Sequence, residues 1–462
     1  MSSAAPGGTR RPPRIPRAVR RSFLDNPVRL VPVGFLATIL LGAGLLMLPL
    51  SRADPSAAVV MPALFTAFSA VCVTGLITVD TPMFWTPFGQ AVIRGLIQVG
   101  GFGIMTLGTL LALLVRKRLG LWTQLVAASE THTVNLGDVR RVLLRVAQIM
   151  FTVEAVVAVI LTLRFRAAYD HELGPALWHG VFHAVSAFNN AGFSVFSDSL
   201  MGFVGDPWIV VPICAAAVVG GLGFPVIIEL LRDSTMRRAW TVHVRLTVLG
   251  TLWLLVLGFV VLAAFEWDRP ETLGDLPVGG KLLGALGLSV FPRTAGFNSI
   301  DYGAASSETL LVTEVLMFIG GGSAGTAGGI KLTTFLVLAY AIWNEVRGHD
   351  QVSIGPRSIS ASVQRQALSV ALLGIAAVVL GTVALLVLTD HGLETALFEC
   401  VSAFATVGLS MGITADLPAA AELVLMALMF MGRVGTITIA TSLALRTQRR
   451  RYRVPEERPI IG

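Results

Sequence analysis

The sequence predicts an all-α polytopic membrane protein in which four similar helical units surround a common axis. Apolar residues make up 54% of the 462 residues and charged residues only 14%, which is more hydrophobic surface than a soluble core could bury. Short segments centred on glycine recur at nearly regular intervals, at Gly75, Gly192, Gly296 and Gly408. Each follows an apolar run too short to cross a bilayer and precedes a longer one. The chain therefore divides into four copies of one unit.

Basic and acidic residues alternate along the chain in the pattern typical of multi-pass membrane proteins. The basic clusters lie in residues 10–21, 116–141, 232–238, 347–365 and 446–453, and the loops between them hold most of the acids. Since positive charge stays on the cytoplasmic side, both termini are predicted to lie in the cytosol and the chain in the inner (plasma) membrane. The net charge of +7 thus indicates a lipid bilayer as partner and no nucleic acid. The acidic outer side would attract cations.

The first unit, residues 30–118, sets the pattern. Residues 31–50 are apolar and long enough to span, whereas the run at 59–73 is shorter than the roughly 20 residues that a spanning helix needs. A re-entrant helix, which enters and returns from one side, fits this second run. The unit closes with a spanning run at 92–115. Residues 1–29 before it are predicted to be a disordered, basic, cytosolic tail.

The other three units repeat this order of spanning run, short run and spanning run. In unit 2, residues 140–232, the runs are 142–163, 176–188 and 208–231. In unit 3, residues 243–347, they are 246–265, 282–291 and 310–343. In unit 4, residues 365–446, they are 367–388, 396–404 and 423–445, followed by a cytosolic tail at 447–462. The sequence therefore predicts eight spanning and four re-entrant helices.

Local identity supports the repeat. Val-Ser-Ala-Phe occurs at 185–188 and again at 401–404, at the same distance before the glycine of its unit. In unit 3 the matching serine, Ser289, lies one residue farther from Gly296, and Pro292 can absorb the extra residue. Glycines also recur in the second spanning run of every unit: Gly101 and Gly103, Gly221 and Gly223, Gly320 to Gly322, and Gly432 and Gly435.

The four glycine segments are predicted to form a selectivity filter for a cation. They comprise Val73, Thr74, Gly75 and Leu76; Asn190, Ala191, Gly192 and Phe193; Thr294, Ala295, Gly296 and Phe297; and Thr406, Val407, Gly408 and Leu409. Non-helical backbone at membrane depth is tolerated only where it lines a cavity or is buried in protein. Rings of backbone carbonyls can replace the water around a cation, and glycine lets successive carbonyls turn to one axis. The negative ends of the short helices also favour cations there. Four unrelated interhelical turns are the alternative, although all four follow a re-entrant run.

These units resemble those of the superfamily of potassium transporters that includes the Trk, Ktr and HKT proteins, over residues 31–445. Because no extra helices precede unit 1, the chain is more similar to the KtrB subgroup of the KtrAB system than to TrkH, which is the alternative. The resemblance implies K+ as the transported ion, held at the filter carbonyls, and no organic cofactor. It also implies a homodimer with one pore per protomer, a cytosolic KtrA-like nucleotide-binding ring, and stimulation by Na+. With a single glycine per segment, lower selectivity is expected than in the two-glycine filter of potassium channels.

A run of small residues inside the second long run of unit 3 resembles the intramembrane gating loop of that superfamily. It consists of Gly320, Gly321, Gly322, Ser323, Ala324, Gly325, Thr326, Ala327, Gly328 and Gly329. Six glycines in ten residues disfavour a helix, although close helix packing through small residues is the alternative. Lys331 directly after the run could anchor it or extend toward the membrane surface.

Arg433 lies in apolar sequence, where an unpaired charge facing lipid would be costly. Its distance from Gly408 matches that of Gly321 from Gly296, so it is predicted to face the pore near the loop. There a fixed cation would oppose K+ and help to hold the gate closed; a structural ion pair is the alternative. Glu154 and Glu399 are predicted to be buried acids of open role.

Two other classes of protein share single features with this sequence. Residues 321–325 fit the Gly-x-Ser-x-Gly pattern of hydrolases, but that motif needs a strand-to-helix turn and a general base, so no enzyme is expected. His183 on the second short run is predicted to be a hydrogen-bonded packing residue. A secondary transporter of a small solute also uses broken helices, but usually with two inverted repeats rather than four parallel units. The sequence leaves open the Na+ site, the regulatory nucleotide, and channel versus coupled transport.

Overall fold

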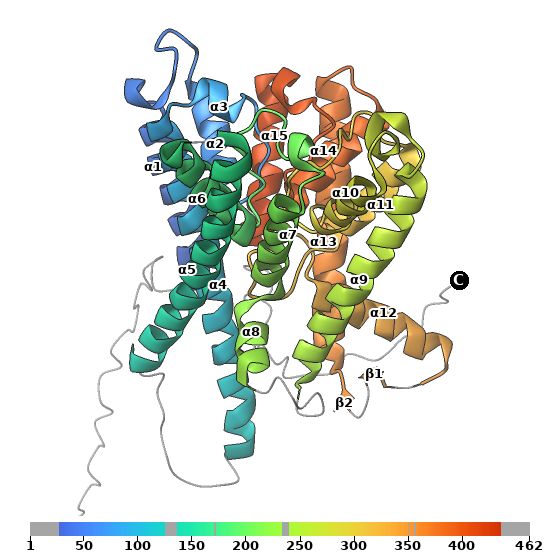
Figure 1. Ribbon diagram of the computed structural model, residues 1–462. Coiled ribbons are helices and arrows are strands. Elements are labelled where there is room, and N and C mark those ends of the chain that lie inside the picture. The colour runs from blue at the N-terminus through green and yellow to red at the C-terminus, as the bar shows by residue number, and fades with distance from the viewer. Residues whose placement is uncertain are drawn as a thin grey trace, which may run out of the picture.

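The computed structural model describes residues 27–124, 136–170, 172–232, 240–349, 351–354 and 357–435. Its helices run mostly along one direction, as Figure 1 shows. The first helix, α1 (Pro27–Leu46), begins within the stretch expected to be the N-terminal tail, since proline fits the first turn of a helix. The rest of that tail, the end of unit 4 and the C-terminal tail at 447–462 lie outside the described residues.

Four short helices occupy the positions predicted to be re-entrant. They are α2 (Val60–Cys72), α6 (Leu173–Asn189), α10 (Val278–Val290) and α14 (Leu393–Ala405). A helix of 13 residues is about 20 Å long, whereas the hydrocarbon core of a bilayer is about 30 Å thick. All four lie in the upper half of the molecule in Figure 1, and α4, α8 and α12 extend below them. The short helices therefore share one depth.

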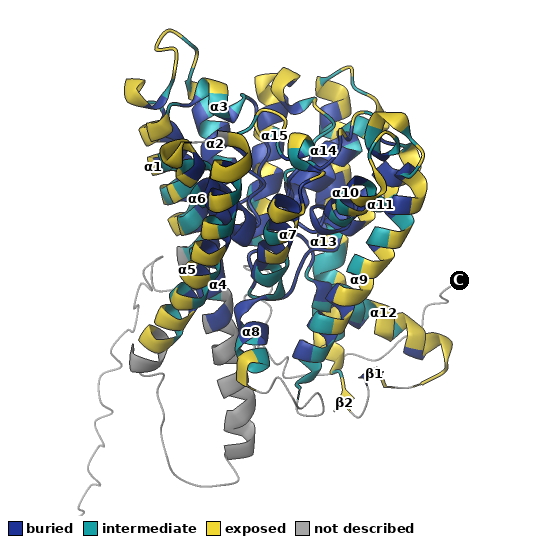
Figure 2. Ribbon diagram, in the orientation of Figure 1, coloured by how far each residue is buried: buried dark blue, intermediate teal, exposed yellow. Residues whose placement is uncertain are grey.

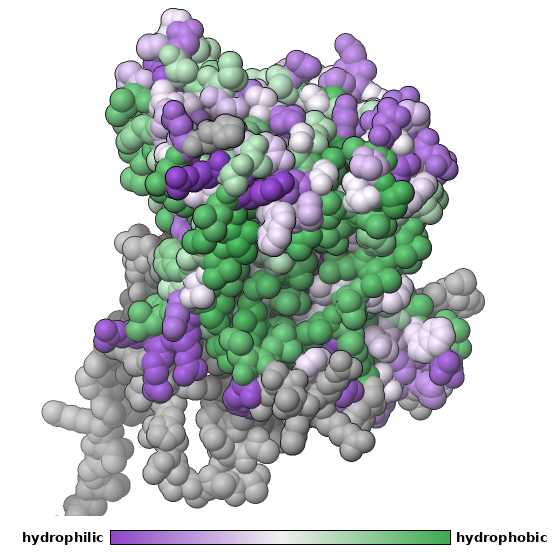
Figure 3. Space-filling model, in the orientation of Figure 1, coloured by the Kyte–Doolittle hydropathy of each residue, from purple (hydrophilic) through white to green (hydrophobic). Residues whose placement is uncertain are grey.

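Longer helices surround them. These are α4 (Pro87–Gln124), α5 (Leu136–Phe165), α9 (Val242–Glu266) and α13 (Ala361–Leu388). Within the described residues, these four contain segments long and apolar enough to cross a membrane. On the face drawn in Figure 3 a broad apolar belt lies between more hydrophilic ends, and the buried residues gather inside in Figure 2. An apolar belt is the surface that a bilayer requires.

The second long segment of unit 2 differs from the prediction. Instead of one span over 208–231, the structure has α7 (Pro207–Leu222) and α8 (Phe224–Arg232), bent by 98° at Gly223. Gly223 has φ +90°, and a Cβ there would collide with the carbonyl oxygen of Ser323. The bend thus results from contact with the small-residue loop of unit 3, which composition alone does not reveal. With this pair counted as one span, the described residues hold up to five candidate spans, and the total of eight stays a prediction.

The second long segment of unit 3 is broken, as predicted. Helix α11 (Ser307–Phe318) ends before the small-residue run, and α12 (Leu332–Val346) begins after it. In unit 4, α15 (Ala419–Phe430) continues into the π-helical turn η8 (Met431–Gly435) at the edge of the described residues. Besides short turns such as α3 (Thr81–Phe84), a small antiparallel pair forms between β1 (Ser353–Ile354) and β2 (Arg357–Ser358), which the all-α prediction did not include.

Two connected apolar clusters fill the interior. One contains residues of all four units, including Phe182 and Phe193 of unit 2, and the other centres on unit 2 and the end of α10. The three cysteines Cys72, Cys214 and Cys400 are buried and free, so they pack as small apolar side chains.

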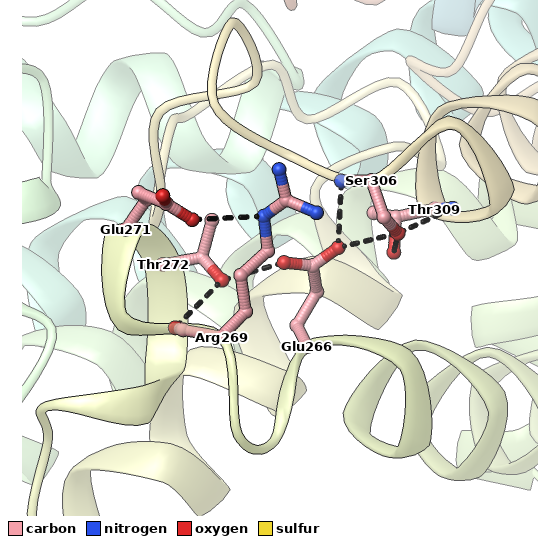
Figure 4. Close-up of polar contacts among 6 residues, drawn as sticks. All are labelled: Glu266, Arg269, Glu271, Thr272, Ser306 and Thr309. Atoms are coloured by element: carbon pink, nitrogen blue, oxygen red, sulfur yellow. Dashed lines mark hydrogen bonds and ion pairs between the residues drawn. The ribbon is translucent and has the colours of Figure 1, made fainter.

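A cluster of hydrogen bonds joins the C-terminal end of α9 to the start of α11 (Figure 4). The carboxylate of the fully buried Glu266 accepts hydrogen bonds from Thr272 Oγ1 at 2.5 Å and from Ser306 N and Oγ at 3.0 and 2.9 Å. Ser306 Oγ in turn caps α11 by accepting from Thr309 N at 3.2 Å. The top of α11 is therefore fixed to α9, above the break in the same segment.

Replacing Glu266 by alanine is expected to destabilise the protein by about 1–3 kcal/mol, because partly buried donors on Thr272 and Ser306 lose their buried, charged acceptor. Thermal unfolding in detergent measures this change. Glu271→Ala is the matched control, since the Glu271 side chain is 63% exposed and its ion pair with Arg269 is on the surface. Equal melting temperatures for both variants would contradict the structural role of Glu266.

Candidate functional site

The chain leaves each of three short helices in the same way. Val73, Asn190 and Thr406 follow α2, α6 and α14 with φ of 57°, 58° and 50°, in the left-handed region. The next amide in each case, for example that of Thr74, donates to the carbonyl oxygen of a serine five residues earlier, at 2.8–2.9 Å. This region is unfavourable for a β-branched residue such as Val73 or Thr406, so the surrounding structure must enforce it.

The exit from α10 contains the extra residue of unit 3. The amides of Ala295 and Gly296 both donate to Phe291 O, at 2.9 and 3.0 Å, and Thr294 adopts the left-handed conformation with φ of 69°. Pro292 lies inside this wider turn. Ser289 is displaced accordingly, and its hydroxyl donates to Leu255 O at 2.6 Å instead of contacting the glycine segment. In units 1 and 4 the matching Ser69 and Ser402 accept from Gly75 N and Gly408 N.

The four glycine segments close into a ring. A Cβ on Gly75 would collide with Ala191 O, one on Gly192 would lie 2.9 Å from Gly296, one on Gly296 would collide with Val407 O, and one on Gly408 with Thr74 O. The contacts thus run from unit 1 to 2, 2 to 3, 3 to 4, and back to 1. All four glycines also have positive φ, between 68° and 101°. Glycine is therefore required twice over, by conformation and by the close approach of the segments.

Further glycines let the second long helices touch the ends of the short helices. A Cβ on Gly100, Gly220 or Gly432 would collide with the carbonyl oxygen of Val71, Phe188 or Phe404, each four residues before the ring glycine of its unit. In units 1 and 2 the glycine that makes this contact lies one residue before the repeated glycines noted in the sequence, Gly101 and Gly221. In unit 3 the matching Gly320 instead meets Gly328 O, within the loop itself.

The small-residue loop packs against the end of α7 and the ring segment of unit 4. Its residues Gly322 and Thr326 donate from their backbone amides to Gly221 O and Gly220 O, at 2.8 and 3.1 Å. A Cβ on Gly328 would collide with the hydroxyl oxygen of Thr406, in the ring segment of unit 4. The loop thus touches unit 2 and unit 4, on opposite sides of the ring.

Two cations, the buried Arg433 and the partly buried Lys331, contact neighbouring carbonyls of this loop. Lys331 Nζ donates to Ala327 O at 2.5 Å, and Arg433 Nη1 donates to Thr326 O. Within the described part of the chain, Arg433 Nε and Nη2 have no hydrogen-bond partner. Arg433 is 2% exposed, so its charge lies inside the protein, in contact with the loop. The contact that the structure gives Arg433 is to backbone, not to an acid.

Arg293, which precedes Thr294, is a cation that the sequence reasoning missed. It is 7% exposed and donates to Thr251 O at 3.3 Å and to Gly320 O at 3.4 Å, so it links the ring segment of unit 3 to the start of the loop. It borders a cavity of about 20 Å³, enough for one water molecule, together with Thr251 and Gly321. Arg293 could have been found from the sequence by the criterion applied to Arg433, namely a single arginine in an apolar stretch.

The two buried acids of open role accept hydrogen bonds from neutral groups. Glu154 on α5 accepts from Gln98 Nε2 at 3.0 Å and from Asn189 Nδ2 at 3.0 Å, which ties α5 to α4 and to the end of α6. Glu399 on α14 accepts from Ser410 and Thr414, beyond the ring glycine of unit 4. Glu154 therefore fixes the end of α6, and Glu399 fixes the backbone that follows the ring glycine of unit 4. Ser323, the centre of the hydrolase-like pattern, lies in a loop with its hydroxyl 3.0 Å from that of Thr333.

An apolar outer belt, several helices long and apolar enough to cross a bilayer and a closed ring of backbone define a helical, multi-pass membrane protein. The sequence matches the TrkH family of cation transport proteins over residues 18–451. This chain therefore belongs to the TrkH family of cation transport proteins.

Similar proteins cover nearly the whole chain. It is 38% identical to the Ktr system potassium uptake protein B of Bacillus subtilis, over 95% of this chain and 97% of that protein. It is 34% identical to the protein of the same name from Vibrio alginolyticus, over 97% and 98%, and to the potassium/sodium uptake protein NtpJ of Enterococcus hirae, over 95% and 97%. These relatives are transport proteins, which supports a transporter over an enzyme.

The fold also matches a solved structure. The potassium transporter TrkH from Vibrio parahaemolyticus superposes with a TM-score of 0.64 at 19% sequence identity, covering 90% of this chain and 85% of that one. This similarity supports the helical membrane fold.

Proposed function

We propose that this chain is the membrane subunit of a potassium uptake system and that K+ passes along the axis of the four glycine segments. The observation that carries the proposal is the closed ring of contacts among Gly75, Gly192, Gly296 and Gly408 at the ends of four short helices. Three relatives of nearly full length are named as potassium or potassium/sodium uptake proteins. The KtrB subgroup is the preferred assignment on the same basis.

The ring has the chemistry that a dehydrated cation needs. Carbonyl oxygens of the four segments replace water ligands, and the C-terminal ends of α2, α6, α10 and α14 add negative dipole potential. The side chains around the ring are unequal, because Val73 and Asn190 occupy places that hold Thr294 and Thr406 in the other units. We expect weaker discrimination between K+ and Na+ than in a filter built of four identical segments.

The loop at 320–329 is proposed to be the gate. It lies against the ring segment of unit 4 and the end of α6, and the cations Lys331 and Arg433 contact its consecutive carbonyls at 327 and 326. A loop in this place blocks the path inward from the ring, and its small residues let it move aside without large side chains to repack. The positive charge beneath it opposes K+ until the loop moves.

The proposed assembly is a homodimer with one pore in each protomer, seated on a cytosolic KtrA-like nucleotide-binding ring. The word "system" in the names of the two Ktr relatives supports a regulatory partner. Na+ is proposed as an activator, and the inner (plasma) membrane as the location, with both termini in the cytosol.

Complementation of a bacterial strain that lacks its own K+ uptake tests the function. Expression of the chain with a KtrA-like subunit is expected to restore growth at low external K+, and Na+ is expected to raise the initial uptake rate. Growth that depends on an organic solute, with uptake stoichiometric to that solute and independent of K+, would instead indicate a secondary transporter.

A further inference from the structure

His183 on α6 makes a polar contact directly behind the ring segment of unit 2. It is fully buried, with Nδ1 at 2.8 Å from His179 O and Nε2 at 3.0 Å from Ser194 Oγ. A carbonyl oxygen can only accept, so Nδ1 carries the proton and Nε2 accepts from the Ser194 hydroxyl. Ser194 Oγ also accepts from Phe196 N at 3.0 Å, and the ring of Phe196 stacks on His183 with centroids 5.0 Å apart. The Ser194 hydroxyl proton has a second acceptor in Ser199 O, but at 3.4 Å that hydrogen bond is longer and weaker than the one to His183.

Glu399 on α14 makes the corresponding contact in unit 4. Its carboxylate accepts from the hydroxyl of Ser410, and Ser410 Oγ accepts from Gly412 N at 2.9 Å. Thr414 Oγ1 lies 3.2 Å from both carboxylate oxygens and 2.9 Å from Ser410 Oγ, which completes the cluster. Glu399 is fully buried.

The two clusters occupy equivalent places in the repeat. His183 and Glu399 both lie nine residues before their ring glycine, and Ser194 and Ser410 both lie two residues after it. In each case a serine hydroxyl donates to an acceptor on the short helix and receives an amide two residues farther along. We call each cluster a clamp, because its hydrogen bonds join the short helix before the ring segment to the backbone that follows the segment.

The clamps occur on opposite sides of the ring. Since the glycine contacts run from unit 1 to 2, 2 to 3, 3 to 4 and back to 1, units 2 and 4 are not consecutive in the ring and lie across its axis from each other. The matching places in unit 1 are Thr66, whose hydroxyl has no partner among the described residues, and Ile77, which has no side-chain donor. In unit 3, which has one extra residue in this turn, the place of the acceptor is taken by the apolar Leu286, three residues before Ser289.

We infer that His183 with Ser194 and Glu399 with Ser410 are paired positioning groups that set how well the ring distinguishes K+ from Na+. This inference rests on the proposed function of the ring. A ring of carbonyl oxygens distinguishes two ions only if the distances between the oxygens are fixed. In each clamp one serine hydroxyl, two residues after the ring glycine, binds a side chain on the short helix before the segment, so the two ends of the segment are joined. Units 1 and 3 lack such a pair; the corresponding links are the hydrogen bonds from Gly75 N to Ser69 Oγ in unit 1 and from Ser299 Oγ to Gly284 O in unit 3, at 3.0 and 3.5 Å.

Initial uptake rates of K+ and Na+ in the complemented strain, normalised to protein in the membrane, test the inference. Ser194→Ala and Ser410→Ala are each expected to lower the preference for K+ over Na+ by about threefold to tenfold, the effect of one lost hydrogen bond. The double variant is expected to lower it more than either single one, with the half-saturating K+ concentration rising more than the maximal rate falls. Ser410→Thr, which keeps the hydroxyl, is expected to restore the preference.

Thr66→Val is the matched control, because it alters the equivalent place in unit 1 without removing a hydrogen bond. Parent-like ion preference in both serine variants, with normal amounts in the membrane, would overturn the inference. An equal loss of preference in Thr66→Val, or no rescue by Ser410→Thr, would also overturn it, since the effect would then be one of general packing. A parent chain that shows no K+ uptake at all would instead refute the proposed function.

Discussion

Replacing Gly296 by serine is expected to abolish most of the preference for K+ over Na+ while leaving a folded protein. Gly296 has φ of 72°, and a Cβ there would collide with Val407 O and lie 3.1 Å from Gly192 Cα. The ring must therefore widen or twist, and its carbonyls lose the spacing that fits a dehydrated K+. Uptake of K+ and Na+ in the complemented strain measures the ratio, which should fall toward unity. The same substitution at Gly75, Gly192 or Gly408 is expected to act in the same direction.

Gly44→Ser on α1 is the control for this series, because a Cβ at Gly44 meets nothing within 4 Å. It should keep the ion preference of the parent. Unchanged preference in all four ring variants would remove the assignment of these segments to a selectivity filter.

Removing the contact of Arg433 with the loop is expected to raise flux when the regulatory subunit is absent. In Arg433→Ala the loop loses a charge-assisted hydrogen bond to Thr326 O, and such a bond contributes about 1.5–3 kcal/mol. Because this bond is formed in the closed state, the ratio of closed to open molecules is expected to fall by about tenfold or more when it is lost. K+ efflux from proteoliposomes containing the membrane subunit alone measures this leak. Deletion of residues 321–327 is expected to raise the leak further.

Arg347→Ala is the matched control, since Arg347 is an exposed arginine stacked on Trp343 at the end of α12. Its leak should equal that of the parent. A leak in Arg433→Ala no greater than that of the parent would leave Arg433 with a structural role only, and a silent or fully regulated deletion variant would count against the loop as gate.

The positions of the ring segments could be predicted from the sequence, because each depends on local features. A short apolar run, a left-handed exit and a glycine follow one another within about 20 residues, and four copies make the pattern visible. The shift in unit 3 was also visible, since Ser289 and Pro292 reveal the extra residue that the turn at Phe291 accommodates. Local spacing was sufficient for both.

Features that depend on contacts between units could not be predicted in this way. The bend at Gly223 arises where α7 meets the loop of unit 3, and Arg293 acquires its role only through Thr251 and Gly320. His183 was expected to be a hydrogen-bonded packing residue, and its partner Ser194 lies beyond the glycine rather than on the same helix. The equivalence of this pair with Glu399 and Ser410 appears only when hydrogen bonds are compared between units.

The central claim is that the cation passes through the ring of four glycine segments. Anomalous diffraction from crystals of the protein grown in Rb+, a heavier substitute for K+, tests it most directly. The account predicts anomalous density on the axis between Gly75, Gly192, Gly296 and Gly408, within carbonyl coordination distance of the segments, and loss of that density when Na+ replaces Rb+. Density at another place in the membrane interior, with none at the ring, would contradict it.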